Sequence, residues 1–218
     1  MPFKPSLHPA DPDLPEDLAP CDLPSELADL EVEACLVEEI DLSARDARGL
    51  GLRESQLVDV DLEGSVLERA RIRDAVWRGG SMGNVRAEGV DVRRARFEGI
   101  RATGVNLTTS QLIDISFVDC RLDLATFRFA ELERVRFDRC RMVESDFYHC
   151  RLSSVVFREC DLTRASWSGA TFERTEMRGC DLSDAGDPQH LRGVRMPWPD
   201  VIRSAGEIAR AAGIEVVE

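Results

Sequence analysis

Cysteines and histidines are the residues of this chain that could most readily bind a metal or attack a substrate. There are seven cysteines and three histidines, and six of the cysteines share one phase of a five-residue spacing: Cys35, Cys120, Cys140, Cys150, Cys160 and Cys180. Their separations match no zinc-binding motif, and no histidine falls in phase with them. A buried free thiol packs as a small apolar group. The spacing therefore indicates structural packing, and we expect no metal or other cofactor.

Acid–base chemistry has one visible candidate pair, Tyr148 and His149. A lone titratable pair on a surface is more often incidental than catalytic. The sequence shows no Gly-rich phosphate loop, no nucleophile elbow and no paired carboxylates that would share a cleft. We therefore expect a protein that is not an enzyme.

The charge balance restricts the partners. The 218 residues include 41 acidic and 28 basic side chains, for a net charge of −13. Direct binding to nucleic acid or to an anionic membrane needs a basic footprint, so neither is expected. The start of the chain shows no apolar segment typical of a signal peptide. Together with an odd number of cysteines, this favours a reducing, cytoplasmic location.

A five-residue period organises the middle of the chain. Every fifth residue from Leu42 to Leu182 is apolar, and the residue two before it is nearly always small or β-branched. Five residues advance an α-helix by about 500°, so these positions would wind around every face of a helix. Two inward residues separated by one outward residue fit a short strand, and the polar or Gly residues that follow fit a corner. Each repeat is therefore predicted to be a short strand followed by a turn.

A second spacing, of twenty residues, indicates how many strands make one coil. Like residues recur at this distance, as expected where stacked strands lie about 4.8 Å apart. Twenty residues per coil mean four sides. The predicted structural core includes Phe97, Phe117, Phe127, Phe137, Phe147, Phe157, Cys120, Cys140, Cys160 and Cys180.

The repeat resembles that of the pentapeptide-repeat proteins. Segments such as Ser145-Asp146-Phe147-Tyr148-His149 and Cys160-Asp161-Leu162-Thr163-Arg164 carry the motif. The resemblance implies an all-β solenoid, a right-handed quadrilateral β-helix of about eight coils over residues 30–186. Residues 1–29 are then an acidic, Pro-rich arm whose composition allows disorder. Residues 187–218 form a C-terminal cap and dimerisation module with a short helix.

The C-terminal module resembles that of Qnr-type quinolone-resistance proteins and their mycobacterial relative. The segment Leu191-Arg192-Gly193-Val194-Arg195-Met196, a predicted helix and Gly213-Ile214-Glu215-Val216 follow in the same order. Residues 214–217 are predicted to form a final short strand. Capping of the open solenoid end is one interpretation. The resemblance implies a second, a tail-to-tail homodimer. Its expected contacts are Trp198, Val201, Ile202, Ala205, Ile208 and Ala209.

The same resemblance implies a function as a mimic of DNA that binds DNA gyrase or topoisomerase IV and protects it from drugs. One side of the predicted rod carries an excess of acids, namely Asp41, Asp61, Glu63, Asp123, Glu144, Asp161, Asp181 and Asp184. The other three sides are balanced, which opposes this hypothesis. The alternative is an interaction scaffold with an unrelated protein partner. A filled solenoid leaves no pocket, so no small-molecule substrate is expected.

Overall fold

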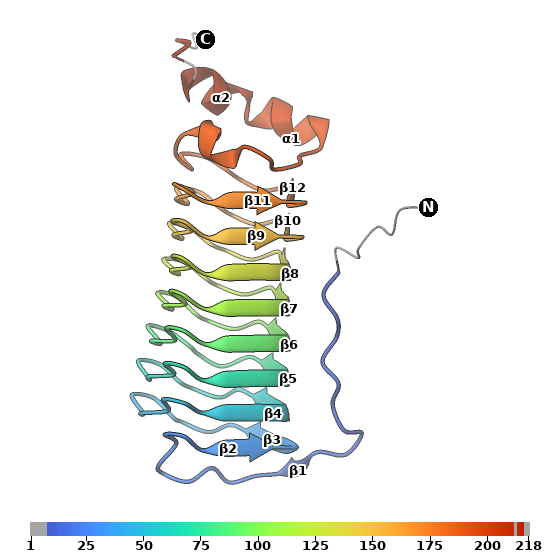
Figure 1. The fold of residues 1–218 in the computed structure, drawn as a ribbon, viewed down its shortest axis with the longest axis vertical. Coiled ribbons are helices and arrows are strands. Elements are labelled where there is room, and N and C mark those ends of the chain that lie inside the picture. The colour runs from blue at the N-terminus through green and yellow to red at the C-terminus, as the bar shows by residue number, and fades with distance from the viewer. Residues whose placement is uncertain (1–7, 212, 216–218) are drawn as a thin grey trace.

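The computed structural model describes residues 8–211 and 213–215, which form a straight rod with an arm beside it and helices at one end (Figure 1). The strands are β1 (Ala19–Pro20), β2 (Glu31–Glu33), β3 (Cys35–Glu38), β4 (Gly51–Val58), β5 (Arg71–Arg78), β6 (Asp91–Glu98), β7 (Gln111–Val118), β8 (Glu131–Asp138), β9 (Arg151–Ser153), β10 (Val156–Arg158), β11 (Thr171–Glu173) and β12 (Glu176–Arg178). The helices are the 3-10 helix η1 (Pro188–Leu191), α1 (Trp198–Arg203) and α2 (Ala205–Ala211).

Each coil of the rod contains twenty residues. The strands pair in parallel, and each residue faces the one twenty positions later, as Ile72 faces Val92 and Trp77 faces Phe97 between β5 and β6. Isolated bridges on the remaining sides keep the same offset, except the last one, between Glu176 and Arg195, which are nineteen residues apart. Every fifth residue from Asp29 to Asp184 has a positive φ and forms a corner. Four corners per twenty residues confirm the predicted quadrilateral β-helix of about eight coils.

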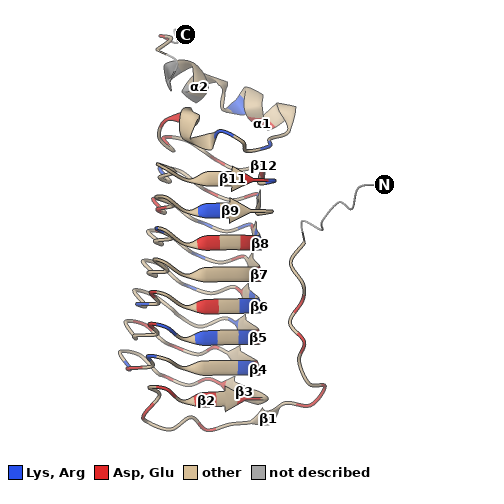
Figure 2. Cartoon of the chain, viewed as in Figure 1, with Lys and Arg blue, Asp and Glu red and all other residues tan. Residues whose placement is uncertain are grey.

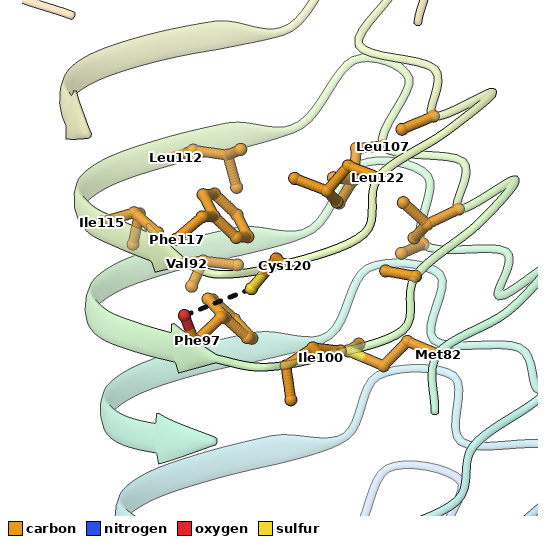
Figure 3. Close-up of a cluster of buried hydrophobic side chains, with 14 of the residues drawn as sticks. Met82, Val92, Phe97, Ile100, Leu107, Leu112, Ile115, Phe117, Cys120 and Leu122 are labelled. Atoms are coloured by element: carbon orange, nitrogen blue, oxygen red, sulfur yellow. Dashed lines mark hydrogen bonds between the residues drawn. The ribbon is translucent and has the colours of Figure 1, made fainter. Parts of the chain in front are cut away.

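The interior consists of stacked side chains, and Figure 3 shows part of it. Phe97, Phe117, Phe137 and Phe157 form one column in which successive ring centroids are 4.9, 5.0 and 4.9 Å apart. Where the small residue of a repeat is Ser, Thr or Cys, it can also link two coils. Ser65 donates its hydroxyl hydrogen to the Leu42 carbonyl at 2.7 Å, and the thiols of Cys120, Cys140 and Cys160 make the equivalent, longer contacts.

The interior is not completely filled, which corrects the expectation of a solid core. An apolar void of about 40 Å³ lies in the middle coils, bordered by Ala87, Ala102, Leu107 and Leu122 among others. Ala87 and Ala102 stand at central positions of the repeat, where most other coils have Leu or Phe. The void has no polar lining to hold water, so it is expected to stay dry.

The arm is attached to the first coil by a short strand and a disulfide. Ala19 pairs with Cys35 and Pro20 with Leu36 between β1 and β3, and Cys21 is disulfide-bonded to Cys35. The expectation that Cys35 is a free packing thiol is therefore wrong. Because one pair of cysteines is disulfide-bonded, the odd number of cysteines does not support the expected reducing compartment.

The C-terminal segment folds as three short helical pieces instead of one helix. Asp187 accepts a hydrogen bond from the Gln189 backbone N–H at 2.8 Å and so begins η1. Pro199 lies in the first turn of α1, where its missing N–H has no helical partner to lose. The final strand expected at 214–217 is absent at Ile214 and Glu215, and residues 216–217 lie outside the described residues.

Candidate protein-interaction surface

The side predicted to be acidic carries a ladder of outward residues stacked one coil apart. In order along the rod these are Asp41, Asp61, Ser81, Arg101, Arg121, Arg141, Asp161 and Asp181. The ladder is acidic at both ends and basic in the middle. A continuous negative stripe like that of a nucleic acid strand is therefore missing from the central coils.

The acids of this ladder also shape the backbone. The carboxylates of Asp41, Asp61 and Asp181 each accept a hydrogen bond from the backbone N–H two residues later, at 2.8, 2.8 and 2.9 Å. The Ser183 hydroxyl also donates to Asp181 at 2.6 Å. The hydrogen bonds from Ser183 hold the pKa of Asp181 below its ordinary value of 3.8, so this residue is charged at neutral pH. Some of the aspartates that the sequence suggested as a binding surface therefore stabilise turns of the backbone.

Nearby arginines neutralise other members of the predicted acidic set. Arg164 lies 2.7 Å from Glu144. Arg141 lies 3.3 Å from Asp123 and 3.9 Å from Asp161. These pairs are exposed on at least one partner, so they contribute little to stability. Their effect is to reduce the local negative field.

The C-terminal helices expose large apolar side chains. Trp198 is 72% exposed and Ile202 57% exposed. Val201 and Ile208 instead line a hollow of about 320 Å³ between the helices and the last coil, together with Leu182, Leu191 and Met196. Ala205 is exposed and Ala209 half-buried. Trp198 and Ile202 therefore form an outer pair on α1, whereas Val201 and Ile208 face the hollow, although Ile208 is still 42% exposed.

The acidic end of the ladder lies next to these helices. Asp181 and Ser183 line a second hollow together with Arg203 and Ser204. Asp200 of α1 accepts a hydrogen bond from the Gly179 backbone N–H at 2.8 Å, which attaches the helix to the last coil. Asp161, Asp181 and Asp184 thus lie at the same end of the rod as the exposed Trp198 and Ile202.

An exposed aromatic cluster was not predicted from the sequence. Phe129 is 50% exposed, and its ring stacks on that of His149, with centroids 5.7 Å apart. Tyr148 contacts both rings edge-on, and the Arg128 guanidinium lies 4.8 Å from the Tyr148 centroid. The twenty-residue spacing of Phe129 and His149, both at corners, could have indicated the stack. His149 here packs against aromatic rings on the surface.

The remaining cysteines lie in the core. Cys120, Cys140, Cys150, Cys160 and Cys180 are free and buried, and burial raises the pKa of the Cys150 thiol, which stays neutral. Among residues 8–211 and 213–215, no group of three or more His, Cys, Asp or Glu side chains is placed to hold a metal. In the same part of the chain, none of the helices has the length and hydropathy needed to cross a membrane.

Several solved structures are similar to this chain. A trypsin-treated form of QnrB1, a plasmid-mediated fluoroquinolone resistance protein, is 18% identical, with a TM-score of 0.48, covering 89% of this chain and 94% of QnrB1. HetL, a pentapeptide repeat protein involved in heterocyst differentiation regulation in the cyanobacterium Nostoc, is 15% identical, with a TM-score of 0.42, covering 70% of this chain and 84% of HetL. No curated protein matches the chain.

A family model matches the coils directly. The pentapeptide repeat region matches residues 90–155 and 110–186. The same five-residue frame continues through the corners of the preceding coils, back to Asp29. Residues 90–186 of this chain are therefore a pentapeptide repeat region.

Proposed function

We propose that this protein is a non-enzymatic interaction module that binds a type II topoisomerase, DNA gyrase or topoisomerase IV, as a homodimer, and modulates it or protects it from poisons. The observation that carries the proposal is the position of the acidic ladder end. Asp161 and Asp181 lie beside helices that expose Trp198 and Ile202. A tail-to-tail dimer through these side chains would bring two acidic ends together at its centre.

In the dimer, the acidic ladder ends of the two protomers would form one longer acidic surface. Duplex DNA carries one negative charge per about 1.7 Å, which one ladder interrupted by arginines does not approach. Two ladder ends joined at a two-fold axis give a short, dense acidic patch flanked by Arg141 on each side. Such a patch would imitate a limited length of duplex at a basic DNA-binding groove, and the C-terminal module's resemblance to that of Qnr-type proteins supports this reading.

The test is a supercoiling assay with purified gyrase, with and without a fluoroquinolone. We expect the protein at micromolar concentration to change the supercoiling rate or to reduce drug-stabilised cleavage. Asp161→Lys with Asp184→Lys should weaken the effect at least tenfold, because both residues lie at the acidic end. Glu38→Lys with Glu39→Lys, far along the rod, is the matched control. No effect of the unmodified protein at tens of micromolar would contradict the proposal.

The exposed aromatic cluster favours a second candidate, a scaffold for an unrelated protein. Phe129 and Leu124 are half-exposed on neighbouring corners of the rod, and aromatic side chains are enriched at binding hot spots. A DNA mimic has no use for an apolar surface here. Under this candidate, Phe129→Ser would abolish binding to the partner and leave gyrase activity unaffected.

A further inference from the structure

One corner of the rod carries alternating acidic and basic side chains, which we call the 74-corner ladder: Asp74, Arg94, Asp114 and Arg134. Arg94 donates two hydrogen bonds to Asp74, at 2.6 and 2.5 Å. Arg134 donates two to Asp114, at 2.7 and 2.8 Å. The guanidinium of Arg94 holds the pKa of Asp74 below its ordinary value of 3.8. Each carboxylate is therefore a fixed, charged acceptor above that pH.

The N-terminal arm, residues 8–20, runs beside the rod (Figure 1), and two of its backbone groups contact this ladder. The Asp13 backbone N–H donates to Asp74 Oδ1 at 3.1 Å, and the Ala10 backbone N–H donates to Asp114 Oδ1 at 3.1 Å. Arg96, on the adjacent side, forms an ion pair with Asp11. The two aspartates thus recognise main-chain groups of the arm, and the arginine recognises a carboxylate.

The spacing of these contacts has a simple geometric origin. The two aspartates lie two coils apart, about 9.6 Å at 4.8 Å per coil. The two arm donors are three residues apart, and one turn of polyproline II helix takes three residues and rises about 9.3 Å. Pro9, Pro12 and Pro15 repeat with the same period and are half-buried. The ladder therefore matches the repeat of an extended polyproline II segment.

Charge adds to this match. The acidic side chains of the arm, Asp11, Asp13, Glu16 and Asp17, are exposed. Basic strand residues flank the ladder in the same coils, at Arg73 in β5 and at Arg96 in β6 (Figure 2), whereas Arg93 is paired with Asp91 at 2.7 Å. An acidic extended segment is thus complementary to this part of the rod in both spacing and charge.

The base of the arm is held firmly. The β1–β3 pairing and the Cys21–Cys35 disulfide fix its base to the first coil. From Ala10 to Asp13, two backbone hydrogen bonds and one exposed ion pair attach it to the ladder. The ion pair and the Ala10 hydrogen bond are exposed, and exposed contacts of this kind are individually weak. The segment that joins Asp13 to the disulfide at Cys21 is a short tether. It gives the arm a local concentration at the ladder in the millimolar range. The arrangement is that of a tethered, replaceable ligand.

We propose that the 74-corner ladder is a docking track for an acidic, proline-spaced polypeptide in polyproline II conformation. The arm occupies the track in cis, and a partner protein that offers a segment of the same chemistry competes with it in trans. This inference is independent of the topoisomerase proposal, since it concerns another face of the rod and another class of contact.

The test releases the arm from the 74-corner ladder while keeping the full-length chain; we call the resulting protein the opened variant. Ala10→Pro with Asp13→Pro removes both N–H donors, while Pro-Pro pairs keep the arm extended. The probe is a fluorescein-labelled peptide with the sequence of residues 8–18, followed by fluorescence anisotropy. We expect it to bind this double variant at least tenfold more tightly than the unmodified protein. Glu16→Pro is the matched control, since it also creates a Pro-Pro pair and should leave binding as weak as in the unmodified protein.

A second pair of substitutions tests the ladder itself. Asp74→Ser with Asp114→Ser, added to the opened variant, should lose at least tenfold in peptide affinity. Ser154 already stands at the same corner, so serine is tolerated there, and an unchanged melting temperature would verify folding. Equal peptide binding by the opened and unmodified proteins, or no binding to the opened variant at 1 mM peptide, would overturn the inference. So would a dimer of the unmodified protein that becomes monomeric in the opened variant, because the track would then be filled by arm exchange between copies.

Discussion

At the residue scale, the repeat assigns each position a narrow role. The central position fills the interior, and the small position two before it either packs or donates to the coil below. The Asp that often precedes the central residue accepts the backbone N–H two residues on, as Asp61 does. This hydrogen bond was not predicted from the sequence, because an outward aspartate in a repeat is equally consistent with a surface charge. It explains why counting acids overstated the electrostatic field of that side.

The void near Ala102 leads to a prediction about stability. Filling about 40 Å³ at ~24 cal/mol per Å³ is worth roughly 1 kcal/mol. We expect Ala102→Val to raise the free energy of unfolding by about that amount and the melting temperature by about 2–4 °C. Ala125→Val is the control, since Ala125 is fully buried away from the void; overpacking there should cost about 1–3 kcal/mol. A lower melting temperature for Ala102→Val, measured by calorimetry, would show that the void is closed in solution.

At the scale of elements, the two ends of the rod are capped by different segments. The first coil is covered by the turn before β2, where Leu27 is 1% exposed. The last coil is covered by η1, α1 and α2, which leave Trp198 and Ile202 exposed. The five-residue rhythm could predict the coils because a periodic backbone constrains every repeat in the same way. It could not predict the arm's course or the Cys21–Cys35 bond, because both depend on contacts between segments that share no period.

The exposed outer pair on α1 gives the prediction for this scale. Trp198→Asp with Ile202→Asp should convert a dimer to a monomer in light scattering, because two charges would be buried at the interface without partners. Both side chains are mostly exposed in the single chain, so the melting temperature should change little. Leu124→Asp, at a residue 53% exposed on the rod, is the control and should leave the mass unchanged. An unchanged mass for the double variant would assign α1 to capping alone.

At the scale of the whole molecule, the rod offers three different surfaces on one rigid frame. One side carries an acidic end beside the exposed helix residues, and one corner carries the exposed aromatics. A third surface, the 74-corner ladder, is occupied by the arm. The sequence could predict the frame and the core columns, since both follow from spacing alone. Which surface binds a partner depends on ion pairs such as Arg141 with Asp123, which cross from coil to coil and are set by side-chain conformations.

The most direct test of the twenty-residue frame compares the thermal unfolding of two insertions. Duplication of residues 101–120 adds one complete coil and keeps every ladder in register, so we expect one cooperative transition at a temperature equal to or above that of the unmodified protein. A single alanine inserted between Ile115 and Ser116 turns Phe117 outward, and we expect the loss of at least half of the unfolding enthalpy. If calorimetry found both insertions equally tolerated, or the duplication the more damaging of the two, the four-sided coil would be contradicted.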